Sequence, residues 1–140
     1  YFAEKYRYLR NFKKIILLCM HAAMKQFGKN LLNEQEVMNN ITDMMMETYL
    51  SESLALRIEK LEDLRGIVTE YRDILDVNIY DTADKVRKSA ADAVWSTEMK
   101  ESVPGLINAL ELLAKVKGVN VKDSRRRIAD KLIADNMYKF

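Results

Sequence analysis

The side chains that most often carry metal-dependent or nucleophilic chemistry are scarce in this sequence. Its only cysteine and histidine, Cys19 and His21, stand two positions apart, and residues so spaced on a helix point to different faces. Asp43 and Glu47 share a helical face, but a di-iron bundle needs Glu-x-x-His on facing helices, and no histidine stands near them. We therefore expect no metal site and no nucleophile–base pair. Cys19 is expected to be a buried, inert thiol, and His21 a helix residue whose ring is hydrogen-bonded or faces solvent.

Three consecutive arginines are the best candidates for contacts with a partner. Arg125, Arg126 and Arg127 share a predicted helix with Lys122 and Lys131, and guanidinium groups bind phosphates and carboxylates through two parallel hydrogen bonds. Nucleic acid is disfavoured as the partner, because the same segment holds three aspartates and no interleaved aromatic residues. Two interpretations stay open. The arginines pair with acidic groups of this chain or another domain, or they contact a phosphate ligand or a membrane surface.

The run Met44, Met45 and Met46 has two interpretations as well. Methionine can line an adaptable groove for a partner, but three in succession spread around most of a helix. We expect one or two of them in the core and one near the surface, and favour core filling over a binding groove. The apolar stripes from which we predict the core include Met44 and Met45 of this run, and also Met20, Ile67 and Trp95.

Composition indicates one compact helical domain. The 140 residues are 49% hydrophobic and 31% charged, with only four glycines and one proline, so sandwiches, barrels and Gly-rich nucleotide folds are disfavoured. The glycines stand far apart, and no P-loop or Gly-x-Ser-x-Gly motif occurs. No apolar run approaches the roughly 20 residues of a membrane span. The composition is typical of a soluble, intracellular protein, and a start at Tyr1 favours a processed product or a piece of a longer chain.

Charge is distributed unevenly along the chain. Residues 1–29 carry seven Lys and Arg against one acidic residue, and residues 115–140 carry eight against three. Residues 30–114 carry eight basic against seventeen acidic groups. Because compact domains balance their own fields, we expect the basic ends to lie against the acidic middle.

Apolar residues recur at three- and four-residue spacing, which predicts long amphipathic helices. Gly28 is placed to end the first helix, while Asn33, Ser102 and Asn120 are placed to cap the second, fourth and fifth. Short links make neighbouring helices antiparallel. The sequence therefore predicts an all-α, up-and-down helical bundle of four to five helices, three long and two short, forming a single domain across residues 1–140. The expected helices span residues 2–27, 34–64, 67–95, 103–114 and 121–134.

Two stretches carry a resemblance to a known family. The first reads FGKNLLNEQEV over residues 27–37 and is followed by Asp43 and, six positions later, by Tyr49. The second reads DSRRRIADKLI over residues 123–133, close to a terminal Phe140. Together they resemble the C-terminal helical extension of bacterial acyl-CoA dehydrogenases of the long, very-long-chain-like type. The resemblance extends over most of the chain.

The resemblance implies an accessory domain of a longer, FAD-dependent enzyme, cytoplasmic in a bacterium. That parent would oxidise an acyl-CoA thioester to the trans-2-enoyl-CoA in fatty-acid β-oxidation, with a glutamate base for the α-proton, FAD as hydride acceptor and an electron-transfer flavoprotein as oxidant of the flavin. No stretch matches the family's catalytic or flavin-binding motifs, so we assign no catalytic, cofactor-binding or metal-binding residue here. The extension is expected to dock on the dehydrogenase core of a homodimer, with Arg125, Arg126, Arg127 and Lys122 as docking or anion contacts.

Two other functions stay open. One is a free-standing helical adaptor without enzyme activity, with a partner groove near Met44–Met46. The other is a peripheral membrane-binding bundle, since the extension of mitochondrial relatives is linked to membrane attachment. Residues 64–118, however, hold no strongly one-sided helix of basic and apolar residues.

Overall fold

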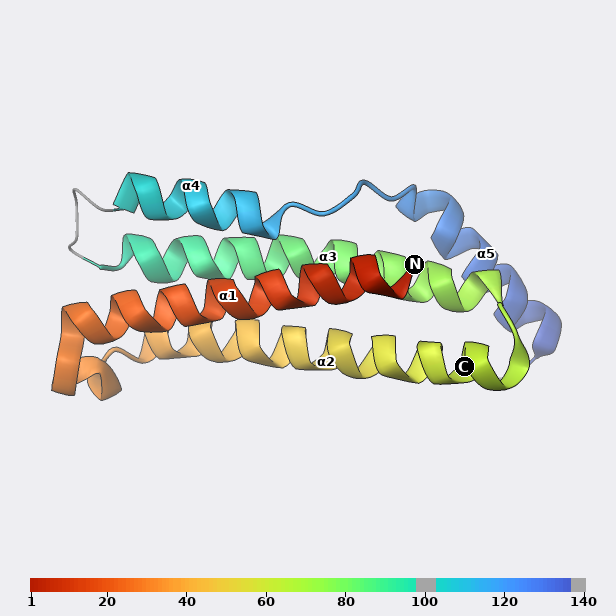
Figure 1. Cartoon of the computed structure of the whole chain (residues 1–140), viewed down its shortest axis with the longest axis horizontal. Coiled ribbons are helices and arrows are strands. Elements are labelled where there is room, and N and C mark those ends of the chain that lie inside the picture. The colour runs from red at the N-terminus through yellow and green to blue at the C-terminus, as the bar shows by residue number, and fades with distance from the viewer. Residues whose placement is uncertain (98–102, 137–140) are drawn as a thin grey trace.

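The structure is a computed structural model and describes residues 1–97 and 103–136. Within these residues the chain is helical and contains no strand, so the predicted all-α class is confirmed. The elements follow one another as shown in Figure 1, and their bounds are α1 Phe2–Phe27, the 3₁₀ helix η1 Gly28–Asn33, α2 Gln35–Arg65, α3 Thr69–Trp95, α4 Val103–Ala114 and α5 Val121–Asp135.

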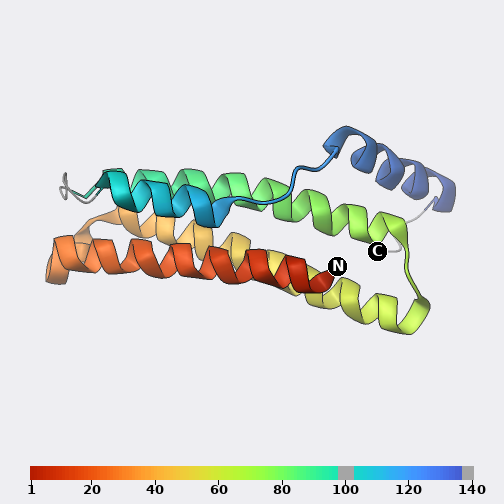
Figure 2. The same ribbon diagram turned by 45° about the horizontal axis from the view of Figure 1, so that its top comes forward.

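Helices α1 to α4 form an up-and-down bundle in which sequence neighbours run antiparallel (Figure 1). α1 packs against α2, α3 and α4, and α3 packs against all four other helices. The shorter α4 lies over α1 and α3, whereas α5 stands at one end of the bundle and packs on α3 alone among the described elements (Figure 2). In the part of the chain that the structure describes, no helix is both long and apolar enough to cross a membrane.

One continuous apolar core joins the four bundle helices. Phe12 and Ile15 of α1, Leu75 of α3 and Leu110 of α4 are almost fully buried in it, as is Met44 of α2. Burying such side chains contributes on the order of 1.5–3 kcal/mol each, so this core and not helix propensity holds the bundle together.

The helix ends follow local signals, with one exception. α1 ends at Gly28 and α2 at Gly66, and both glycines have a positive φ that other residues rarely adopt. Asn120 caps α5 by accepting the backbone N–H of Asp123, as predicted. The prediction of Asn33 as the cap of α2 is wrong, because η1 runs through Asn33 and α2 begins after Glu34 without a side-chain cap. Ser102 lies outside the described residues.

Four side chains that were predicted to lie in the core are exposed in the structure. Met20, Met45 and Trp95 are exposed although their positions fit the apolar periodicity of their helices, and Ile67 is exposed in the link before α3, which begins only at Thr69. The apolar stripes of α1 and α2 are therefore wider than the bundle itself buries. Periodicity identifies an apolar face, but it does not show how much of that face the chain's own helices cover.

Thr48 of α2 is buried, and its Oγ1 has no hydrogen-bond partner among the described residues. Replacing it by valine keeps the shape and removes a polar atom that burial separates from water. We expect Thr48→Val to raise the free energy of unfolding by about 1 kcal/mol, measured by urea denaturation. The matched control is Thr82→Val: Thr82 is equally buried but shares a 2.9 Å hydrogen bond with Ser51, so this variant should lose about 1 kcal/mol instead. Equal effects of the two variants would contradict the argument.

Candidate docking site

The three arginines of α5 have different surroundings. Arg127 makes a two-pronged ion pair with Asp73 of α3, donating from Nε and Nη2 over 2.7 and 2.6 Å. Ser124 adds a hydrogen bond of 2.8 Å to the same carboxylate, and both Asp73 and Ser124 are buried. These contacts, with the hydrogen bonds from Arg127 as the largest cause, hold the pKa of Asp73 below its usual range, although burial opposes the shift. We name Asp73, Ser124 and Arg127 the α5 clamp.

The remaining cations of α5 divide into paired and outward-facing groups. Arg125 pairs with Asp81 of α3 over 2.9 Å at the surface. Lys122 is exposed, and its ion-pair partner within the described ranges is its neighbour Asp123, at 3.3 Å. Arg126 is exposed and has no ion-pair partner within residues 1–97 and 103–136. Two of the three arginines thus pair with the acidic middle of the chain, and Arg126 and Lys122 face outward.

A second buried charge lies where the start of α1 meets α3. Lys5 is only 6% exposed and pairs with Asp76 over 2.6 Å, with the ring of Tyr1 5.0 Å from its Nζ. The Tyr1 hydroxyl also donates to Asp76, over 2.8 Å. Nearby, the backbone N–H of Lys117 donates to the Tyr8 hydroxyl, which ties the link before α5 to α1. This network was not predicted, because a lysine in a basic N-terminal segment gives no sequence signal of burial.

Cys19 and His21 lie in different surroundings. Cys19 is a buried free thiol, and burial raises its pKa to about 12, which makes the reactive thiolate scarce at neutral pH. His21 is exposed. Among the described residues, no group of three or more histidine, cysteine, aspartate or glutamate side chains could hold a metal ion.

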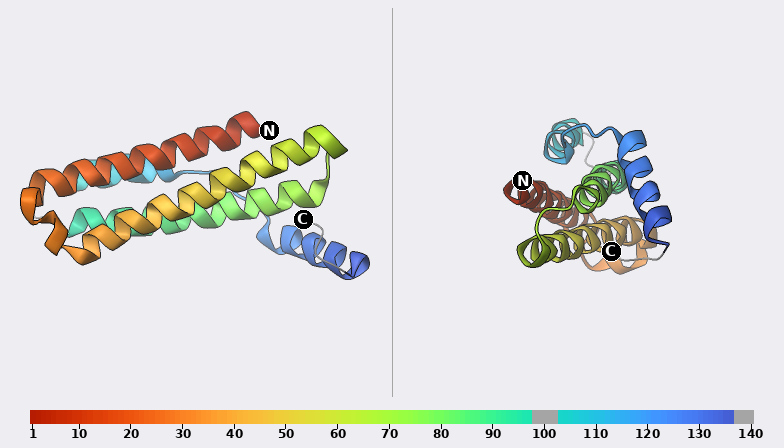
Figure 3. Two further views of the ribbon diagram at one scale, coloured as in Figure 1. Left: turned by 90° about the horizontal axis from the view of Figure 1, so that it is seen from below. Right: turned by 90° about the vertical axis from the view of Figure 1, so that its right-hand side faces the viewer.

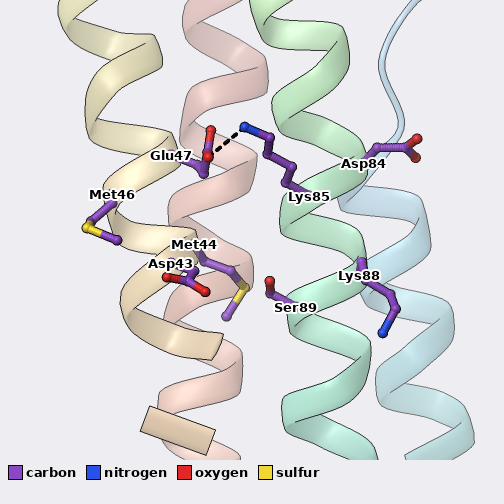
Figure 4. Close-up of a pocket in the computed structure, with 8 residues that line it drawn as sticks. All are labelled: Asp43, Met44, Met46, Glu47, Asp84, Lys85, Lys88 and Ser89. Carbon is purple, nitrogen blue, oxygen red and sulfur yellow. Dashed lines mark hydrogen bonds and ion pairs between the residues drawn. The ribbon is translucent and has the colours of Figure 1, made fainter. Parts of the chain in front are cut away.

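A groove of about 530 Å³ lies between α2 and α3, and Figure 4 shows its side chains. Glu47 of α2 reaches across it to Lys85 of α3 in an ion pair of 2.7 Å. Its lining sets three carboxylates against two lysines, and this small acidic excess is too weak to indicate a charged ligand. The lining residues are Asp43, Met44, Met46, Glu47, Asp84, Lys85, Lys88 and Ser89.

The methionine run separates into a core residue and two surface residues. Met44 is buried, whereas Met45 and Met46 are 50% and 53% exposed. Met46 lies in the α2–α3 groove, and Met45 lines a second, mainly apolar groove between α1 and α2. The expected core role therefore holds for Met44 alone. Two methionines of the run lie at the surface, where one was expected.

Comparison with known proteins places this bundle in a family. A family model described as "Acyl-CoA dehydrogenase, C-terminal domain" matches residues 11–110, from α1 into α4. A "Probable acyl-CoA dehydrogenase" of Bacillus subtilis (strain 168) is 28% identical over 128 residues, which are 90% of this chain and 21% of that protein. The crystal structure of an acyl-CoA dehydrogenase complexed with FAD from Bacillus anthracis matches with a TM-score of 0.91 and 26% identity, over 97% of this chain and 24% of that one.

The chain therefore spans only about a fifth to a quarter of the length of these relatives. The matched residues include the bundle and its grooves but stop before α5 and its arginines. Since the family model covers most of the chain, the chain belongs to the acyl-CoA dehydrogenase C-terminal domain family.

Proposed function

We propose that this chain is the C-terminal accessory domain of a longer, FAD-dependent acyl-CoA dehydrogenase and that it serves docking and oligomerisation. The observation that carries the proposal is the family match, supported by the FAD-complexed relative whose fold it shares over nearly its whole length. An up-and-down bundle with a buried inert thiol and no metal-binding group among its described residues suits an accessory role.

The parent enzyme would oxidise an acyl-CoA to the trans-2-enoyl-CoA in fatty-acid β-oxidation. A glutamate base would take the α-proton, the β-hydride would pass to FAD, and an electron-transfer flavoprotein would reoxidise the reduced flavin. We place the base and the flavin contacts in the dehydrogenase core, outside this segment, and assign none of its residues to them. We propose a cytoplasmic location for the parent.

Two cations of α5 are proposed as contacts with the dehydrogenase core of either subunit in a homodimer. Arg126 and Lys122 face outward, whereas Arg125 and Arg127 already pair with α3. The outward cations suit an acidic or phosphate-bearing surface, because a guanidinium and an ammonium present several donors to such groups.

Charge reversal of these two cations tests the proposed contact. In the full-length holoenzyme we expect Lys122→Glu with Arg126→Glu to raise the dimer dissociation constant about tenfold at low salt, measured by analytical ultracentrifugation. The effect should shrink as ionic strength rises. The control is Lys60→Glu with Arg65→Glu, which makes the same charge change at exposed positions of α2. An unchanged dissociation constant in the α5 variant would contradict a role of α5 in assembly.

A further inference from the structure

The outer side of the bundle between α1 and α2 carries a band of exposed apolar side chains. Leu17 is 64% exposed and Tyr49 is 69% exposed, and Met20, Met24 and Met45 lie beside them. Residues 17, 20 and 24 follow one face of α1, and residues 45 and 49 follow one face of α2, as three- and four-residue spacing requires. We call this band the α1–α2 groove.

The groove is a real depression with an apolar lining. It encloses about 380 Å³, and its walls are made by Ile16, Leu17 and Met20 of α1 and by Met45, Thr48 and Tyr49 of α2. One end is closed by Lys13 and Glu52, which pair across it over 2.7 Å. The groove is therefore apolar along its length and polar at one end. Its methionines can adapt to the shape of a partner.

Neither α4 nor α5 covers this side, and no residue of η1, which packs on α1 and α2, lines the groove. α4 packs on α1 and α3, and α5 packs on α3, so both lie on other sides of the bundle (Figure 3). The α1–α3 side shows what a covered side looks like. There α4 buries Val103, Leu110 and Ala114 on its inner face, and the core continues through it.

The size of the groove favours an occupant joined to the same chain. Its lining runs from Lys13 to Met20, about 10 Å along α1 at 1.5 Å per residue, which is the length of about two turns of an amphipathic helix. Its five exposed apolar side chains fall far short of the roughly 20–30 residues a side of a free-standing protein interface. A tethered partner needs far less area, because linkage gives it an effective concentration in the millimolar range. The family relatives supply such a partner, since about four-fifths of their length lies outside the part that this chain matches.

We propose that the α1–α2 groove binds an amphipathic helical segment of the dehydrogenase part of the same polypeptide. The inference rests on the proposed function and names the face by which the domain docks on its core. It also accounts for Met20 and Met45, whose apolar character the isolated bundle does not use.

Met45 and Met46 provide an internal pair for the test, because they are adjacent, identical in type and almost equally exposed in the domain. The full-length, FAD-loaded protein is treated with hydrogen peroxide, and sulfoxide formation at each methionine is followed by tandem mass spectrometry. We expect Met45 to oxidise at least about fivefold more slowly than Met46, with Met20 protected alongside it. Equal rates at Met45 and Met46 in a flavin-loaded protein of full length would overturn the docking face while leaving the proposed function intact.

Two variants show whether the protection comes from docking in this groove. Leu17→Glu with Tyr49→Lys keeps the net charge and changes only exposed positions, and it should bring Met45 to the rate of Met46. Leu112→Glu with Ile133→Lys makes matched changes at exposed apolar positions of α4 and α5 and should leave Met45 protected. Loss of protection in the α4–α5 variant alone would overturn the proposal. So would protection that rises with protein concentration, which indicates a second copy, or that needs added vesicles of anionic lipid, which indicates a membrane.

Discussion

Replacing Asp76 by alanine is expected to lower the free energy of unfolding by about 3 kcal/mol, because it leaves the buried ammonium of Lys5 without its carboxylate. Lys5 lies beneath Tyr1 and Tyr8, and its amine reaches Asp76 over 2.6 Å. Glu4 is the other acid near it, at 4.0 Å, and lies closer to solvent. Urea denaturation followed by circular dichroism measures the change.

Replacing the other partner, Lys5, shows whether an unpaired buried charge or lost packing causes the destabilisation. Lys5→Met keeps most of the buried stem, and Asp76 retains the Tyr1 hydroxyl and contact with water. We expect this variant to lose about 1 kcal/mol or less, because removing the buried ammonium removes its desolvation cost as well. If Lys5→Met destabilised the protein as much as Asp76→Ala, the account of a buried lysine that depends on Asp76 would be wrong.

Asp73→Ala is expected to release α5 from the bundle. The change removes the acceptor for Arg127 and the acceptor for the hydroxyl proton of the buried Ser124. Because α5 packs on α3 alone among the described elements, the loss should appear as local opening and not as global unfolding. We expect the free energy of opening α5 to fall by about 2 kcal/mol, measured by hydrogen exchange of the amides in residues 124–135.

A surface pair provides the control for the clamp. Asp81→Ala removes the partner of Arg125, but both groups of that pair are well exposed. We therefore expect it to lower the free energy of opening α5 by only about 0.5 kcal/mol. The effect of Asp73→Asn on this free energy should lie between those of Asp73→Ala and Asp81→Ala, since the amide oxygen can still accept from Ser124. Equal protection of α5 in all three variants would show that the clamp does not hold the helix.

The clamp also predicts the direction of a pH dependence. The pKa of Asp73 is lower in the folded protein than its ordinary value of 3.8, so the carboxylate stabilises the docked α5 fully above that value. The stabilisation is lost as the pH falls below 3.8 towards the folded pKa. Opening of α5 should therefore increase on acidification in this window, and Asp73→Asn should remove that contribution.

Local sequence signals predicted the elements well, because each depends on neighbours in the chain. α1 spans Phe2–Phe27 as expected, and Asn120 caps α5 through the residue three positions later. Asn33 does not cap α2, because it is the last residue of the 3₁₀ helix η1. Capping preferences alone do not decide between two local structures that place the same residue differently.

The candidate site was predictable only in part, because its partners are distant in sequence. The arginine run is visible in the sequence, but nothing local pairs Arg127 with Asp73, 54 positions away. The apolar periodicity that marks Met20 and Met45 likewise does not say whether a helix of this chain or another part of the protein covers them. Both outcomes depend on tertiary packing, which a single sequence specifies only through the whole fold.

Four features of the domain divide into two that hold it together and two that face outward. The buried core holds α1 to α4 together, and the clamp fixes α5 to α3. The outward cations of α5 and the α1–α2 groove lie on different sides of the bundle, and both are proposed here as contacts beyond the domain. A domain so built is suited to joining other parts of a larger protein.

The most direct test of the proposed function is the size and colour of the natural gene product. We expect mass spectrometry of the endogenous protein to give a chain several hundred residues longer than this one. The purified protein should be yellow, with bound FAD, and should oxidise acyl-CoA. A colourless product of about this length would contradict the account and would favour a free-standing helical adaptor.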